Sequence, residues 1–89
     1  MHRAPLDGNA AAGILGEVFV AEMTVATTTC STCGAVAQVG QLRAYLSAPG
    51  AVLRCAACGA AQIRVVRGPD RAWVDLRGVQ VLQVALDSA

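Results

Sequence analysis

The sequence predicts a small α+β domain that is mostly β and is stabilised by a metal ion. Three observations lead to this fold class. The chain has 89 residues, which is the size of one domain. Most of it consists of short runs rich in β-branched residues, with turn signals between them. The third observation is a pair of Cys-x-x-Cys units, since a chain this small buries little surface and often depends on a metal for stability.

Residues 6–22 are predicted to form one amphipathic helix, after a flexible tail at residues 1–5. Apolar side chains recur at helical spacing in this segment, at Leu6, Ala10, Ala11, Ile14, Leu15, Val18 and Phe19. Asp7 is the expected N-cap. Three glycines in the segment each cost about 1 kcal/mol relative to alanine inside a helix. The helix is therefore expected to form only when it docks, and its own core is favoured over a partner as the docking surface.

Residues 23–89 are predicted to form the β domain. The expected strands are the runs TVATTT (24–29), AVAQVG (35–40), LRAYL (42–46), AVLR (51–54), QIRVVR (62–67), AWVDL (72–76) and GVQVLQVAL (78–86). The turn signals SAPG (47–50) and GPD (68–70) separate four of them. In a further turn, Gly78 is expected to adopt a positive φ and Arg77 to pair with Asp75 or with Asp7.

The cysteines carry the strongest chemical signal in the chain. They are Cys30, Cys33, Cys55 and Cys58, and 21 residues separate the two Cys-x-x-Cys units. Two such units at this spacing are typical of a zinc site with four thiolate ligands, because two intervening residues let the chain turn both sulfurs toward one ion. A glycine follows each unit, Gly34 and Gly59, and is expected to adopt a left-handed conformation at low steric cost.

Four thiolates fill the coordination sphere of a tetrahedral zinc, so the predicted ion is one structural Zn²⁺ and not a catalytic one. Three alternatives stay open: one iron ion in the same site, reduced buried cysteines without metal, and a dithiol that works in redox chemistry or releases zinc on oxidation. The formal net charge is +1. Four thiolates and one divalent cation together carry −2, so the metal-loaded chain carries −1, and Arg54 is placed to screen the site.

Residues 27–67 resemble the zinc-ribbon proteins, in which two knuckles such as CSTCG and CAACG each lead into a β-hairpin. The resemblance implies a ribbon fold and a metal, but no particular function, because zinc ribbons serve many roles. The two CxxCG units also resemble rubredoxin, in which four cysteines hold one iron that carries an electron. Rubredoxins are acidic and rich in aromatics, whereas only Phe19, Tyr45 and Trp73 are aromatic here.

A closer likeness spans nearly the whole chain. The segments LDGNAAAGILGEVF (6–19), MTVA (23–26), APGAVLRCAAC (48–58) and WVDLRG (73–78) resemble a family of small bacterial proteins of unknown function. This resemblance implies a stand-alone zinc-ribbon protein and brings no activity with it.

No arrangement of side chains indicates an enzyme. His2 is the only histidine and lies in the predicted tail, and the six carboxylates are scattered without a visible pair. No run approaches the ~18 apolar residues that a membrane span needs. We therefore expect a cytoplasmic, non-catalytic module that binds or adapts to other macromolecules; the sequence makes no prediction of its oligomeric state.

A protein partner is favoured over nucleic acid because the charges nearly balance. The nucleic-acid alternative uses the arginines around Trp73 on the C-terminal hairpin, which are Arg64, Arg67, Arg71 and Arg77. The favoured interpretation of this hairpin is a solvated edge with Trp73 filling the core.

Overall fold

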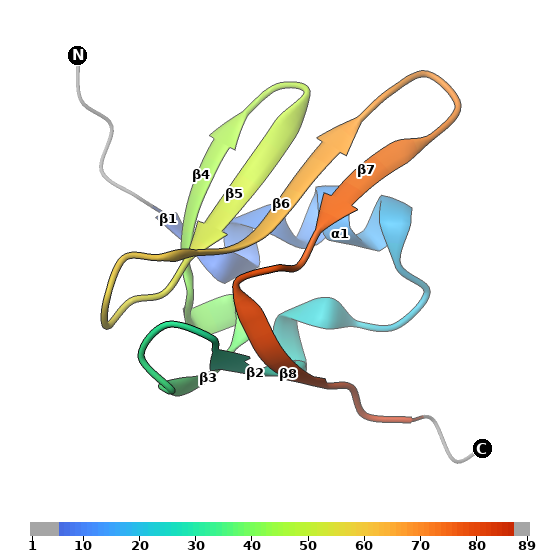
Figure 1. Cartoon of the computed structure of the whole chain (residues 1–89). Coiled ribbons are helices and arrows are strands. Elements are labelled where there is room, and N and C mark those ends of the chain that lie inside the picture. Colours follow the sequence, from blue (N-terminus) through green and yellow to red (C-terminus); the bar gives the residue numbers. More distant parts are fainter. Residues whose placement is uncertain (1–5, 87–89) are drawn as a thin grey trace.

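Eight strands form two antiparallel sheets in the computed structural model, which describes residues 6–86 (Figure 1). The strands are β1 (Leu6–Asp7), β2 (Thr27–Cys30), β3 (Val36–Gln38), β4 (Arg43–Ser47), β5 (Gly50–Arg54), β6 (Ala61–Arg67), β7 (Ala72–Asp75) and β8 (Val79–Gln83). The helical elements are α1 (Ala12–Val18) and the short 3-10 helices η1 (Gly8–Ala11), η2 (Met23–Val25) and η3 (Val39–Gln41). The predicted tail at residues 1–5 lies outside the described residues.

The larger sheet has the strand order β1-β4-β5-β6-β7, and the smaller sheet has the order β3-β2-β8. Two of the larger sheet's hairpins close at the predicted turns, β4 to β5 through residues 47–50 and β6 to β7 through residues 68–70. The sequence prediction of a small, mostly β domain with one α-helix is therefore confirmed for the described residues.

The N-terminal helix is shorter than the predicted segment 6–22. Leu6 and Asp7 are extended and pair with β4, and only Ala12–Val18 is α-helical. Asp7 does act as a cap, since its Oδ1 accepts a hydrogen bond from the N–H of Asn9 at 3.1 Å, but it caps η1. The helical spacing of apolar residues includes Leu6. This residue is nevertheless extended, because its backbone pairs with Ala44 at the edge of β4, and this pairing outweighs helical propensity.

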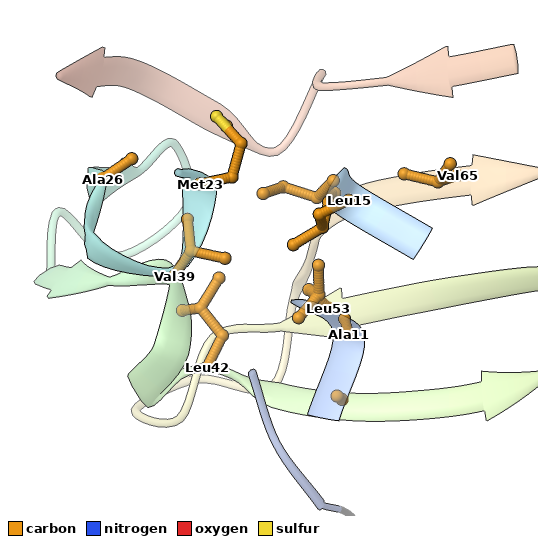
Figure 2. Packing of buried hydrophobic residues seen from close by; sticks show 10 residues of the cluster. Ala11, Leu15, Met23, Ala26, Val39, Leu42, Leu53 and Val65 are labelled. Carbon is orange, nitrogen blue, oxygen red and sulfur yellow. The ribbon is translucent and has the colours of Figure 1, made fainter. Parts of the chain in front are cut away.

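The hydrophobic core lies between α1, the 3-10 helices and the inner face of the larger sheet (Figure 2). Leu15 of α1 is 1% exposed and belongs to the same buried cluster as Leu53 of β5 and Ile63 of β6. On the far side of Leu15 the cluster continues through Met23 and Val39. The helix therefore docks on the protein's own core, as predicted. No helix in residues 6–86 has the length and apolar character needed to cross a membrane.

Two expectations for the C-terminal hairpin are wrong. Trp73 does not fill the core. It lies on the face of the larger sheet that is turned away from α1, and 58% of its surface is exposed. Gly78 has no positive φ; among residues 6–86 only Gly34 and Gly59 do. Gly78 is instead required by a close approach, since a Cβ on it would lie 1.9 Å from the carbonyl oxygen of Ala61. The expected ion pair of Arg77 is with Asp75, at 2.7 Å.

Candidate metal centre

The four cysteines come from two turns that belong to different sheets. Cys30 ends β2 of the smaller sheet, and Cys33 lies in the turn that leads to β3. Cys55 directly follows β5 of the larger sheet, and Cys58 lies in the turn that leads to β6. Cys30 and Cys55 are buried, whereas Cys33 and Cys58 are exposed. The site therefore lies where the two sheets meet, with one side open to solvent.

Each turn, here called a knuckle, has the same backbone geometry. In the first knuckle (residues 30–34) the N–H of Gly34 donates to the carbonyl of Cys30 at 2.9 Å, and in the second (residues 55–59) Gly59 donates to Cys55 at the same distance. The two glycines have φ values of 77° and 80°, as their expected left-handed conformation requires. A side chain is strained at such φ values, so the glycine after each cysteine pair is a geometric need of the turn.

The two knuckles bring all four sulfurs within 4.8 Å of one another. The contacts run across the knuckles: the Sγ atoms of Cys30 and Cys58 are 3.7 Å apart, and those of Cys33 and Cys55 are also 3.7 Å apart. Zn–S bonds of about 2.3 Å in a tetrahedron place neighbouring sulfurs about 3.8 Å apart. The sulfur set therefore fits one tetrahedral metal ion and could hold it.

The backbone of each knuckle prepares its first cysteine to bind as a thiolate. The N–H of Cys33 is the largest influence on Cys30 and, with the N–H of Thr32, lowers the pKa of that thiol to about 6. The N–H groups of Cys58 and Ala57 lower the pKa of Cys55 in the same way. Amide dipoles directed at a sulfur stabilise its negative charge and so favour the ligand form of cysteine.

Crowding of the sulfurs acts in the opposite direction. The N–H of Ala60 favours the thiolate of Cys58, but burial and the three neighbouring sulfurs outweigh it and raise the pKa of Cys58 to about 11. Four negative sulfurs in this space repel one another unless a cation lies between them. A cation held between the four sulfurs could supply the compensating charge.

The two knuckles differ in what supports them. The first is held by the turn between β7 and β8, because the N–H of Ser31 donates to the carbonyl of Gly78 at 2.9 Å. The second is held by a side chain, since Nη1 of Arg54 donates to the carbonyl of Gly59 at 3.0 Å. The Arg54 guanidinium carbon also lies 5.8 Å from the centre of the Tyr45 ring.

All four predicted ligands are therefore brought together. Among residues 6–86 they form the only group of three or more Cys, His, Asp or Glu side chains placed to share an ion. His2 lies outside the described residues. The sequence reasoning missed the contact between Ser31 and Gly78, because no local pattern links residues so far apart in the chain.

The chain matches a known protein family. No curated protein and no solved structure matches the chain. A family model described as a family of unknown function, DUF6510, matches residues 1–87. The chain with this four-cysteine centre therefore belongs to DUF6510, a family of unknown function.

Proposed function

We propose that the four cysteines bind one structural Zn²⁺ and that the protein is a non-catalytic binding module of the zinc-ribbon type. The observation that carries the proposal is the convergence of four sulfurs, two from each sheet, within 4.8 Å. An ion at their centre links residues that are distant in the chain and joins the two sheets. Structural zinc sites contribute roughly 10–16 kcal/mol in small peptides, which is comparable to the net stability of a domain.

Zinc is the ion that such a site holds most often, and four thiolates leave it no position for a water molecule or a substrate. The ion then supplies stability and no Lewis-acid chemistry. Iron remains the other possible occupant of the same ligand set, with an electron-transfer role.

The remaining acidic groups support a non-catalytic role. Each of the five carboxylates in residues 6–86 makes a local contact: Glu17 pairs with Arg67, Asp70 with Arg71 and Asp75 with Arg77, while Asp7 and Glu22 accept hydrogen bonds from their own turns. These contacts give each carboxylate a structural role, as expected in the proposed module. A protein partner, favoured by the net charge, remains a prediction.

Native mass spectrometry with elemental analysis of the same sample tests the proposal. We expect one zinc per chain and a mass that shows the loss of four thiol protons. A red protein with one iron per chain would overturn the zinc assignment and would make the reduction potential the next measurement. The loss of ordered β-structure on chelation, followed by circular dichroism, tests whether the ion is structural.

A further inference from the structure

The outer face of the larger sheet is not covered by any described element. Figure 1 shows α1 behind this sheet, and the apolar inner residues pack toward that helix. The face turned away from α1 is here called the outer face. Its residues include Asp7 on β1, Arg43 and Tyr45 on β4, Val52 and Arg54 on β5, Arg64 and Val66 on β6, and Trp73 and Asp75 on β7.

Two aromatic rings are displayed on this face. Trp73 is 58% exposed and Tyr45 is 41% exposed. Trp73 lies across from Val66, which is itself 45% exposed, and both line a hollow of about 540 Å³ that is also lined by Arg64, Asp75 and Arg77. The edge of the indole lies close to Gly68, since a Cβ there would be 3.0 Å from Cζ3 and 3.3 Å from Cη2 of Trp73. A large apolar ring with this much exposed surface is suited to stacking.

The arginines divide into two groups. Among residues 6–86, the arginines with a carboxylate partner are Arg67, Arg71 and Arg77. The other three, Arg43, Arg54 and Arg64, all lie on the outer face. Arg54 bonds the second knuckle and lies over Tyr45. Arg43 and Arg64 are exposed and form no salt bridge with a described carboxylate, although Asp7 and Asp75 lie opposite them on the neighbouring strands. The outer face therefore carries three arginines and two carboxylates, which leaves a small excess of positive charge.

We propose that the outer face binds single-stranded nucleic acid, with a base stacked on Trp73 and phosphates on Arg64 and Arg43. Trp73, Arg64 and Arg43 lie on β7, β6 and β4, so the ligand crosses four strands, about 14 Å, which is enough for two or three nucleotides. Aromatic platforms beside cations on an open antiparallel sheet suit splayed bases and their phosphates. This inference depends on the proposed binding role and replaces the protein partner expected from the net charge with a nucleic acid.

Charge distinguishes this occupant from two others. A second copy that met the same face would place arginines against arginines. An acidic peptide that added a strand would use the β7 edge, where Asp70 with Arg71 and Asp75 with Arg77 already neutralise each other. Arg43 and Arg64 lie on the inner strands β4 and β6, so an anionic ligand is expected to lie across the face.

The test is fluorescence anisotropy with labelled 12-nucleotide single strands of DNA and RNA, with the same DNA sequence as a duplex for comparison. We expect a single strand to bind at least tenfold more tightly than the duplex, and the DNA and RNA arms to show which sugar is preferred. With two or three phosphate contacts, raising the salt concentration from 50 to 200 mM is expected to weaken binding about 5- to 20-fold.

Variants locate the site. Trp73→Ala is expected to weaken single-strand binding about tenfold or more, and Trp73→Phe to retain most of it. Arg64→Gln and Arg43→Gln are each expected to weaken it several-fold. Arg67→Gln is the matched control: it removes the same charge from β6, but Arg67 pairs with Glu17, so less than a twofold change is expected.

The proposal is wrong if no single strand binds at 20 mM salt, or if Arg67→Gln weakens strand binding as much as Arg64→Gln does. It is also wrong if a labelled oligo-glutamate peptide binds and the strands do not. A dimer in sedimentation that Trp73→Ala dissociates would show that the face binds a second copy of the chain. Metal content and circular dichroism are measured on every sample. One zinc per folded chain without strand binding rejects this inference alone. Strand binding by a folded chain without zinc rejects the proposed metal role alone.

Discussion

The two knuckles have nearly the same backbone conformation, but different neighbouring residues support them. Both have a glycine at a φ near 80°. In each, the glycine N–H donates to the carbonyl of the first cysteine, and the N–H of that cysteine donates to the carbonyl of the alanine after the glycine. The first knuckle is supported by backbone, through the bond from Ser31 to Gly78, and the second by a side chain, through the bond from Arg54 to Gly59. The five-residue unit therefore specifies its own turn, whereas its position in the fold depends on hydrogen bonds to residues outside the unit.

The largest effect is expected from removing one of the four cysteines that the two knuckles contribute to the metal site. Cys55→Ala leaves three ligands, so we expect loss of zinc and unfolding of most of residues 27–67, including the first knuckle, which the substitution does not touch. Zinc content and far-ultraviolet circular dichroism measure this. Ala56→Ser in the same turn is the control and should keep both. A folded spectrum for the Cys55 variant would show that the knuckles do not depend on each other.

Gly78→Ala is expected to have the next largest effect and to act on the first knuckle. A Cβ at this position would lie 1.9 Å from the carbonyl oxygen of Ala61, so the turn that supports Ser31 must move. We expect the free energy of unfolding to fall by about 3 kcal/mol, at the upper end of overpacking effects. Urea denaturation measures it, and amide exchange should rise at Ser31 more than at Ala56. An equal rise at both positions would contradict the separate support of the knuckles.

Gly34→Ala and Gly59→Ala are expected to cost the same, about 1–2 kcal/mol each. Both positions require a left-handed backbone, and nothing lies within 4 Å of either added Cβ, so strain is the whole effect. Gly16→Ala in α1 is the control: its added Cβ also meets nothing, and alanine there should stabilise the protein by about 0.5–1 kcal/mol. Clearly unequal costs at the two knuckles would show that their surroundings alter the turn itself.

Arg54→Gln is expected to weaken the second knuckle only, by about 1 kcal/mol, because it removes the hydrogen bond to Gly59. The rate at which a chelator removes zinc should increase. Arg43→Gln, at the position opposite Arg54 on the neighbouring strand, removes the same charge and should leave this rate nearly unchanged. If the two variants accelerate release equally, Arg54 acts through general charge and not through its bond.

The smallest effect concerns the turn behind the first knuckle. Hydrogen bonds from the Arg77 side chain and N–H lower the pKa of Asp75 to about 2, below its usual value. The ionised form is therefore the stabilising one: its contribution is present above about pH 4 and is lost as the pH falls through about 2. We expect the Asp75 carboxyl to remain ionised at pH 3 by carbon NMR, and Arg77→Gln to shift its titration upward. An unchanged titration in that variant would contradict the pairing.

Local sequence predicted the parts of this structure whose causes are local. The turns at residues 47–50 and 68–70, most strand positions and the left-handed glycines follow from residues that are adjacent in the chain. The metal ligands were predicted for the same reason, since each Cys-x-x-Cys-Gly unit forms its own turn. The helix at residues 6–22 was predicted too long because its apolar period could not reveal that Leu6 pairs with Ala44.

Residues that are close together in the chain account for the two knuckles, the four clustered cysteines and the β character of the chain. The packing of the two sheets sets which sheet each knuckle joins, that Trp73 faces solvent, and that Gly78 is needed for a close approach and not for its φ. The same packing places the three described arginines that form no salt bridge on one face of the larger sheet. The physical reason is that backbone torsions and hydrogen bonds within a turn act over a few residues. Burial and charge pairing depend on which strands lie side by side.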